Sequence, residues 1–167
     1  MQLSEFRDRL NDRLNHADYA GVDASANGLQ VGRADGRTVE RAAFAVDGVE
    51  ATAETAADAG ADVLVVHHGM VWGGLDRVTG RDYDRVAALV DNDLALYVSH
   101  LPLDGHAELG NAEPYATERT YPGMVHRYSE IDLYGSGFDD SSYRELAVER
   151  LATEITNHQA LIQNEST

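Results

Sequence analysis

Two adjacent histidines, His67 and His68, directly follow the apolar run of residues 63–66 and precede Gly69. The run holds four apolar residues, three of them valine, which predicts a strand buried on both faces of a parallel sheet. Such a strand delivers the residues after it to the carboxyl edge of the sheet, where ligands bind in open α/β folds. Because imidazole is the commonest metal ligand, the pair is a candidate metal site. The alternative is that both histidines only satisfy backbone groups at the strand end.

A second group of candidate ligands follows the next predicted strand. His100, Asp104 and His106 come shortly after the apolar residues 94–98. Since parallel strands of one sheet end at the same edge, we expect these side chains near the histidine pair. A carboxylate can bridge two cations, and imidazole suits Zn, Fe, Ni or Mn. Taken singly, each of the three could instead be a hydrogen-bonding, turn or surface residue.

The hydrophobic pattern predicts an α/β fold around this edge. Strands are predicted at residues 29–31, 42–46, 61–66 and 94–98, and helices at residues 3–16, 49–59 and 81–90. Strand, helix and strand in so short a span favour right-handed βαβ units with parallel pairing. The expected fold class is therefore α/β, with a mixed, largely parallel sheet flanked by helices.

Side-chain positions are also predicted. The helix at 81–90 is expected to bury four side chains, Tyr83, Val86, Ala87 and Val90. His16 is expected at the end of the first helix, where the helix dipole favours an imidazolium. Trp72 lies in the loop 69–80 after the histidine pair, where it could line a site or simply pack, and packing is the favoured interpretation.

The pattern weakens after residue 112. A loop is expected at 113–122, a strand at 125–134 and a capped amphipathic helix at 139–151. We therefore expect an α/β metal-site domain at residues 1–112 and a shortened C-terminal α/β segment of the same fold at residues 113–167.

The charge balance limits the classes of partner. There are 29 acidic residues against 13 basic ones, and the net charge is −16. Every basic residue is arginine, lysine is absent, and Asp outnumbers Glu. The charge disfavours nonspecific binding to nucleic acid or anionic membranes, which requires a cationic face. Short acidic side chains without lysine are typical of a surface hydrated in concentrated salt, so we expect a halophilic protein.

Two further features bear on the compartment and the chemistry. The chain contains no cysteine, which excludes disulfides, thiolate metal sites and a cysteine nucleophile. No apolar run is long enough to span a bilayer, and residues 1–8 have neither a basic head nor a hydrophobic signal core. We expect a cytoplasmic protein without membrane association.

Three motifs occur in order along the chain. Asn-Gly-Leu-Gln-Val-Gly occupies residues 27–32, a Gly-Ala-Asp strand ending in His-His occupies residues 60–68, and His-x-x-x-Asp occupies residues 100–104. With these motifs the chain resembles the Nif-three-like proteins, often labelled GTP cyclohydrolase I type 2 homologues. The resemblance covers about residues 1–112.

The resemblance implies a metal centre and an assembly. It implies an α/β fold with two divalent metal ions per subunit, of which Zn, Fe, Mn, Ni and Mg are not distinguished. The implied ligands are His67, His68 and Asp104, each histidine holding one metal and the carboxylate bridging them. His100 matches the motif and is expected to lie behind the ligands. A toroidal homohexamer is the implied assembly.

The C-terminal half departs from the family pattern. The family supplies a further His and Glu there, in a Gly-His-Tyr-x-Thr-Glu-like motif that this sequence does not match. Two alignments are open, one placing Glu154 at the carboxylate and one placing the 153–158 region at an earlier strand. Glu154 and His158 therefore receive no site role, and the chain is expected to be shortened or incomplete in this half.

Two main functions follow from these observations. The first is a metal-dependent hydrolase, cyclohydrolase-like or phosphoesterase-like, acting on a small molecule, because paired metal ions activate water. The second is a ring-forming metal-binding scaffold, metal chaperone or sensor without turnover, which an incomplete ligand set would favour. A third possibility is a purely structural subunit that no longer binds metal.

Overall fold

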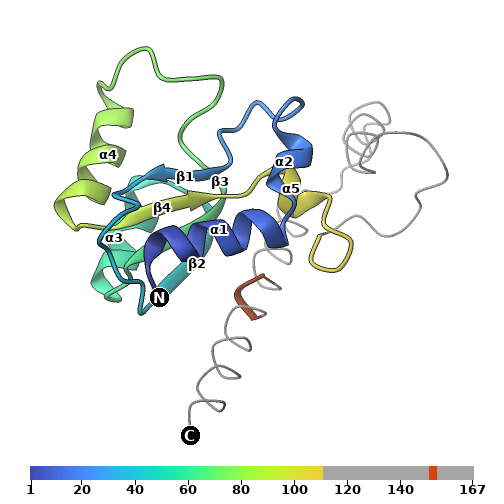
Figure 1. The fold of residues 1–167 in the computed structure, drawn as a ribbon. Coiled ribbons are helices and arrows are strands. Elements are labelled where there is room, and N and C mark those ends of the chain that lie inside the picture. The colour runs from blue at the N-terminus through green and yellow to red at the C-terminus, as the bar shows by residue number, and fades with distance from the viewer. Residues whose placement is uncertain (111–150, 154–167) are drawn as a thin grey trace, which may run out of the picture. The chain divides into compact units, whose positions relative to one another are not determined.

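The computed structural model describes residues 1–110 and 151–153, and the chain divides into two compact units, Met1–Leu103 and Asp104–Thr167 (Figure 1). The elements in chain order are α1 (Leu3–Arg13), α2 (His16–Tyr19), β1 (Gly28–Val31), β2 (Ala42–Asp47), α3 (Glu50–Asp58), β3 (Val63–His68), α4 (Arg81–Asp91), β4 (Ala95–Val98) and α5 (Leu101–Asp104). The last residue of α5, Asp104, is the first residue of the second unit.

The four strands form one sheet in the order β1-β4-β3-β2. β2, β3 and β4 are parallel, and β1 pairs antiparallel with β4 at the edge. The helix α3 connects β2 to β3, and α4 connects β3 to β4, so the parallel part consists of two consecutive βαβ units. The predicted fold class, a mixed and largely parallel sheet flanked by helices, is confirmed.

The two faces of the sheet are covered by different helices. Alternate residues of β3 point to opposite faces, and Leu64 and Val66 belong to the apolar cluster that includes Leu89 of α4 and alanines of α3. On the other face, Phe6 of α1 meets Tyr97 of β4 edge-on, with ring centroids 6.3 Å apart. Both faces of β3 and β4 are thus buried, as their continuous apolar runs predict, whereas β2 at the edge of the sheet is only partly buried (Figure 1).

The register of the strands brings their ends to one edge. Asp47 of β2 is opposite His68 of β3, and Val66 of β3 is opposite Val98 of β4. The antiparallel strand β1 starts at the same edge, where Gly28 is opposite Val98. Segments that follow β2, β3 and β4, together with the segment that precedes β1, therefore lie side by side.

Three details of the sequence prediction are wrong. β3 continues through His67 and His68, so the histidines are its last two residues and do not follow it. In α4, Tyr83 and Val90 are 59% and 61% exposed, because the buried stripe runs through Leu89 and the partly buried Val86. Residue 90 lies about 100° around the helix from residue 89, which turns it toward solvent.

The strand predicted at 125–134 and most of the helix predicted at 139–151 lie outside the described residues. Residues 151–153 are helical, and Leu151 is buried. Within the described parts of the chain, no helix is long and apolar enough to cross a membrane.

His16 also differs from its prediction, because it begins α2 and does not end α1. Its Nε2 lies 3.0 Å from the Ser99 hydroxyl and 3.2 Å from that of Tyr97, and the Tyr97 hydroxyl donates to Asn11. Burial lowers the pKa of His16 to about 4, although the charge of Asp23 acts in the opposite direction. The side chain is therefore neutral and partly buried, with no dipole-stabilised charge.

This burial predicts a pH dependence of stability. Between pH 6.5 and about 4 the unfolded chain binds a proton at His16 that the folded chain does not. The free energy of unfolding should therefore fall as the pH falls through this window, by up to about 1.4 kcal/mol per pH unit from this group. The variant His16→Gln should show a shallower slope in chemical denaturation at fixed salt. Equal slopes in the two proteins would contradict a lowered pKa of His16 in the folded chain.

Candidate metal centre

Three histidines converge at the carboxyl edge of the sheet. His67 and His68 end β3, and His100 comes two residues after β4. Potential ligand nitrogens of the three side chains all lie within 4.8 Å of one another. The ring centroid of His67 lies 4.5 Å from that of His68 and 4.9 Å from that of His100. His67 is fully buried, and the other two are partly buried, so the cluster opens to one side.

Two of the imidazoles are held through Nδ1 by oxygen atoms. The Nδ1 of His68 lies 2.7 Å from a carboxylate oxygen of Asp47, its register partner on β2. The Nδ1 of His67 lies 3.3 Å from the backbone carbonyl of Ser99. A carbonyl or carboxylate oxygen only accepts hydrogen bonds, so Nδ1 is the protonated nitrogen in both rings. Nε2 is then the nitrogen that carries a lone pair, as a metal ligand requires.

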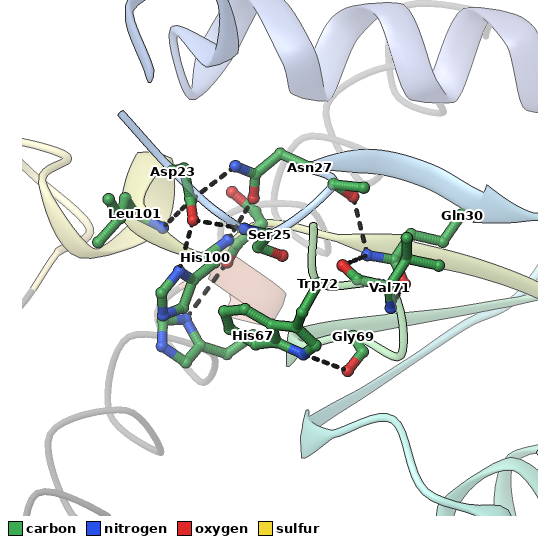
Figure 2. Close-up of polar contacts among 12 residues, drawn as sticks. Asp23, Ser25, Asn27, Gln30, His67, Gly69, Val71, Trp72, His100 and Leu101 are labelled. Atoms are coloured by element: carbon green, nitrogen blue, oxygen red, sulfur yellow. Dashed lines mark hydrogen bonds and ion pairs between the residues drawn. The ribbon is translucent and has the colours of Figure 1, made fainter. Parts of the chain in front are cut away.

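The third imidazole is held in the same way by Asp23. The Nδ1 of His100 lies 3.0 Å from Oδ1 of Asp23, whose side chain is only 2% exposed (Figure 2). The same carboxylate accepts hydrogen bonds from the side chain of Asn27 and from the backbone N–H groups of Ser25 and Leu101. Burial alone would raise the pKa of Asp23, but these four hydrogen bonds, that from His100 first, lower it to about 2.

Gln30 holds the loop that follows the histidine pair. The pairing of β1 with β4 shifts register at Gln30, and a bulge of this kind redirects a side chain. Its amide oxygen accepts from the N–H groups of Met70 and Val71, 2.9 and 3.1 Å away. Its amide nitrogen donates to the carbonyl of Ala26 at 2.8 Å. One side chain therefore ties the segment before β1 to the segment after β3 (Figure 2).

Trp72 lies beside the cluster. Its ring is edge-on to that of His100, with centroids 4.9 Å apart, and its centroid lies 6.1 Å from that of His68. The indole N–H donates to the carbonyl of Gly69, and the side chain is 43% exposed. Trp72 therefore lines the histidine cluster, which is the interpretation that the sequence analysis did not favour (Figure 2).

Asp104 and His106 belong to the second unit of the chain. Asp104 is the last residue of α5, and its side chain is buried. His106 is also buried, and its Nδ1 accepts from the N–H groups of Glu108 and Leu109 at 3.2 and 3.1 Å. The role of Asp104 as a metal ligand remains a prediction from the sequence motif. Glu154 and His158, to which the sequence assigns no site role, lie outside the described residues.

Comparison with known proteins identifies the family. The family model Duf34/NIF3 (NGG1p interacting factor 3) matches residues 1–158. The chain belongs to this family. The resemblance drawn from the three sequence motifs is therefore confirmed.

Two curated relatives are similar to this chain over most of its length. Over 147 residues the chain is 56% identical to the GTP cyclohydrolase 1 type 2 homolog of Halobacterium salinarum, covering 85% of this chain and 56% of that protein. Over 133 residues it is 42% identical to the homolog of Archaeoglobus fulgidus, covering 74% of this chain and 53% of that one. The chain spans about half the length of the curated relatives it matches.

Solved structures agree with the fold. The crystal structure of TTHA1606 from Thermus thermophilus superposes on this chain with a TM-score of 0.61 and 38% sequence identity. The match covers 66% of this chain and 45% of the TTHA1606 chain. The structure of reduced HcgD from Methanocaldococcus jannaschii gives a TM-score of 0.57 and 27% sequence identity, over 68% of this chain and 48% of the HcgD chain.

The structure gives a physical reason for one of the three sequence motifs of this chain. In the Asn-Gly-Leu-Gln motif, Asn27 accepts a hydrogen bond from the backbone N–H of His100 at 2.7 Å, while Gln30 holds the loop after the histidine pair. Gly28 between them has a φ of +99°, which favours glycine. The motif thus fixes both segments that carry the histidine cluster.

Asp23 and Asp47, which orient His100 and His68, were missed by the sequence prediction. Asp47 could have been found, because it ends the predicted strand 42–46 and so belongs at the same edge as the histidines. Asp23 gives no such signal, because its contact with His100 spans 77 residues of sequence. His100 was predicted to lie behind the ligands, and the structure groups it with the pair.

Gly69 is required by the contact between Gln30 and its loop. A Cβ at this position would lie 2.5 Å from Oε1 of Gln30 and 2.6 Å from Cγ2 of Val98. The variant Gly69→Ala should therefore displace the Gln30 amide and destabilise the fold by about 1–3 kcal/mol. Chemical denaturation at fixed salt measures this loss.

Gly21→Ala is the matched control, because a Cβ at Gly21 would meet nothing within 4 Å. It should change the free energy of unfolding by less than about 0.5 kcal/mol. Equal stability of the two variants would contradict the close packing at Gly69.

Proposed function

We propose that this chain forms a divalent-metal centre of a metal-dependent hydrolase that acts on a small molecule. The centre is dinuclear, with His67 and His68 each holding one metal and Asp104 bridging them. The proposal for Asp104 rests on the His-x-x-x-Asp motif of the family, and the proposal for the histidines rests also on their geometry.

The observation that carries the proposal is the common orientation of the three imidazoles. Each ring donates its Nδ1–H to a fixed oxygen, from Ser99, Asp47 or Asp23, which places the lone pair on Nε2. Such carboxylate–histidine and carbonyl–histidine pairs are the usual support of metal-binding histidines, since they fix tautomer and ring orientation. An imidazole-rich donor set fits Zn, Fe, Ni or Co better than Mg, which prefers oxygen ligands.

Metal ions bound at this edge would lower the pKa of bound water and polarise a phosphoryl or ring-amide oxygen of a substrate. The residues of the chain supply the remaining requirements. Asp47 and Asp23 hold the imidazoles in place, and Gln30 keeps the following loop against the site. The partial exposure of His68, His100 and Trp72 leaves one side of the cluster accessible to a small molecule.

The name of the curated relatives, GTP cyclohydrolase 1 type 2 homolog, suggests a cyclohydrolase-like reaction. A phosphoesterase-like reaction uses the same metal-activated water and is an equal candidate. Both reaction classes are proposed for this chain, because none of the site residues described above is specific for a guanine ring.

A non-catalytic metal-binding scaffold, chaperone or sensor is the second candidate. It is favoured by one observation, namely that the described histidine cluster by itself offers ligands for a metal ion. The C-terminal His and Glu of the family motif have no clear match in the sequence. A site that lacks these ligands would hold one ion, or bind two weakly, and would not support turnover.

We also propose that the protein works in a salt-rich cytosol as a ring, a toroidal homohexamer by family resemblance. The net charge of −16 and the absence of lysine support the halophilic setting. The high identity to a homolog from Halobacterium salinarum agrees with it.

Metal content tests the proposal. Elemental analysis of untagged protein, purified in high salt without chelator, should find close to two divalent ions per chain. The variant Asp104→Ala should lose most of the bound metal, since the bridging carboxylate is removed. Asp91→Ala, which removes an exposed carboxylate at the end of α4, is the matched control and should keep its metal.

One ion per chain in the wild type would favour the scaffold over the hydrolase, and hydrolase substrates would then give no turnover. Unchanged metal content in Asp104→Ala would contradict the dinuclear centre. No metal in the wild type would contradict metal binding altogether.

A further inference from the structure

We propose that the outer edge of β2 pairs antiparallel with the same strand of a second copy of this chain, about a twofold axis at Phe44. The four-stranded sheets of the two copies would then form one continuous sheet across the interface. The inference concerns how copies of the chain assemble, so it goes beyond the proposed function and does not depend on bound metal.

β2 is an edge strand with a row of backbone groups on its outer side. It is the last strand in the order β1-β4-β3-β2, and in the part of the chain that the structure describes no further strand pairs with it. The N–H of Gly48, just after β2, donates to the carbonyl of His68, so the even-numbered residues direct their backbone groups toward β3. Since these groups alternate in direction along a strand, Ala43 and Ala45 direct theirs outward.

The two edges of the sheet differ in how they are protected against pairing. β1 has only four residues, and its register shifts at Gln30, an irregularity that blunts an edge. β2 has six residues, which keep one unbroken register with β3. Residues 42–46 contain no charge and no proline, the other common means of protection. An edge of this kind is a template for pairing with another strand.

The sequence of this edge identifies the partner as a second copy. Residues 41–47 read Arg-Ala-Ala-Phe-Ala-Val-Asp. With Phe44 on the twofold axis, Arg41 lies opposite Asp47 of the second copy, and Asp47 lies opposite Arg41 of the second copy. Both side chains are exposed in the single chain. Opposite charges directly across an antiparallel pair are favourable, so the strand is complementary to itself in this register.

The same register satisfies the backbone groups. Ala43 of one copy exchanges two hydrogen bonds with Ala45 of the other, because the backbone groups of both residues point outward. The two Phe44 residues then form a non-hydrogen-bonded pair, in which opposing Cα atoms lie about 4.5 Å apart. Phe44 is only partly buried in the single chain, and an aromatic pair across the strands would cover it.

The contact is compatible with the strongly acidic surface. The net charge of −16 makes copies of the chain repel one another, but salt at molar concentration screens charges beyond about 3 Å. Residues 42–46 add no charge of their own to this repulsion. Molar salt is therefore the condition in which the pairing is expected and tested.

Disulfide trapping tests the register. The chain has no cysteine, so Phe44→Cys introduces a single thiol per copy. In molar salt and under mild oxidation, this variant should become a covalent dimer almost completely, because opposing Cα atoms about 4.5 Å apart suit a disulfide. Ala42→Cys, on the same face of the same strand, is the matched control. Its two Cα atoms would lie about 14 Å apart, so it should not cross-link.

The mass of the assembly tests whether the pairing holds without a cross-link. Sedimentation equilibrium of the full chain in molar salt should show an even number of copies. Ala45→Pro removes an outward N–H and keeps the bonds to β3, so it should halve this mass. Val90→Ala, which shortens an exposed apolar side chain on α4, is the control and should leave the mass unchanged. Far-UV circular dichroism identifies the variants that fold.

Three results would overturn the proposal. The first is a wild type that is monomeric in molar salt. The second is Phe44→Cys that cross-links no more than Ala42→Cys, which decides the matter even if Ala45→Pro does not fold. The third is a folded Ala45→Pro variant with the mass of the wild type. None of these results changes the expected metal content, so failure of this inference is distinguishable from failure of the proposed function.

Discussion

The parallel register of β2, β3 and β4 is the constraint on which the rest of the structure depends. It sets Asp47 opposite His68 and Val66 opposite Val98, so that three strand ends meet at one edge of the sheet. A shift of β4 by one residue against β3 would turn the side chains of β4 to the opposite faces of the sheet and move His100 away from His67 and His68. The buried apolar runs of β3 and β4 fix the register, because both faces of these two strands are covered.

Register alone brings the histidines together, and hydrogen bonds then orient them. Each imidazole is tied at Nδ1 to a different oxygen, and the supporting groups come from the segment before β1, the last residue of β2 and the segment after β4. Gln30, on a bulge of β1, adds the loop after β3 to the same network. The cluster is thus built from four segments that are distant in sequence, and a ligand would meet a site already arranged.

The sequence predicted the elements and most of the residues at this edge, because apolar runs and the polar residues after them are local signals. It placed His67 and His68 correctly at a strand end, but it could not give the tautomer of either ring, which depends on Asp47 and Ser99. Asp23 could not be found from pattern, since a single Asp in a loop resembles any turn residue. The wrong orientation of Val90 has a similar cause, because several apolar residues of α4 compete for one buried stripe.

The most direct test of a metal centre on this cluster uses Trp72, the only tryptophan in the sequence, whose ring lies beside those of His68 and His100. Co²⁺ bound to the histidines should quench its fluorescence in a saturable way, with a midpoint that matches the binding curve measured independently. The variant His67→Ala should lose this quenching, although Trp72 itself is unchanged. Co²⁺ binding that leaves the fluorescence of the wild type unaltered would place the metal elsewhere and contradict the account.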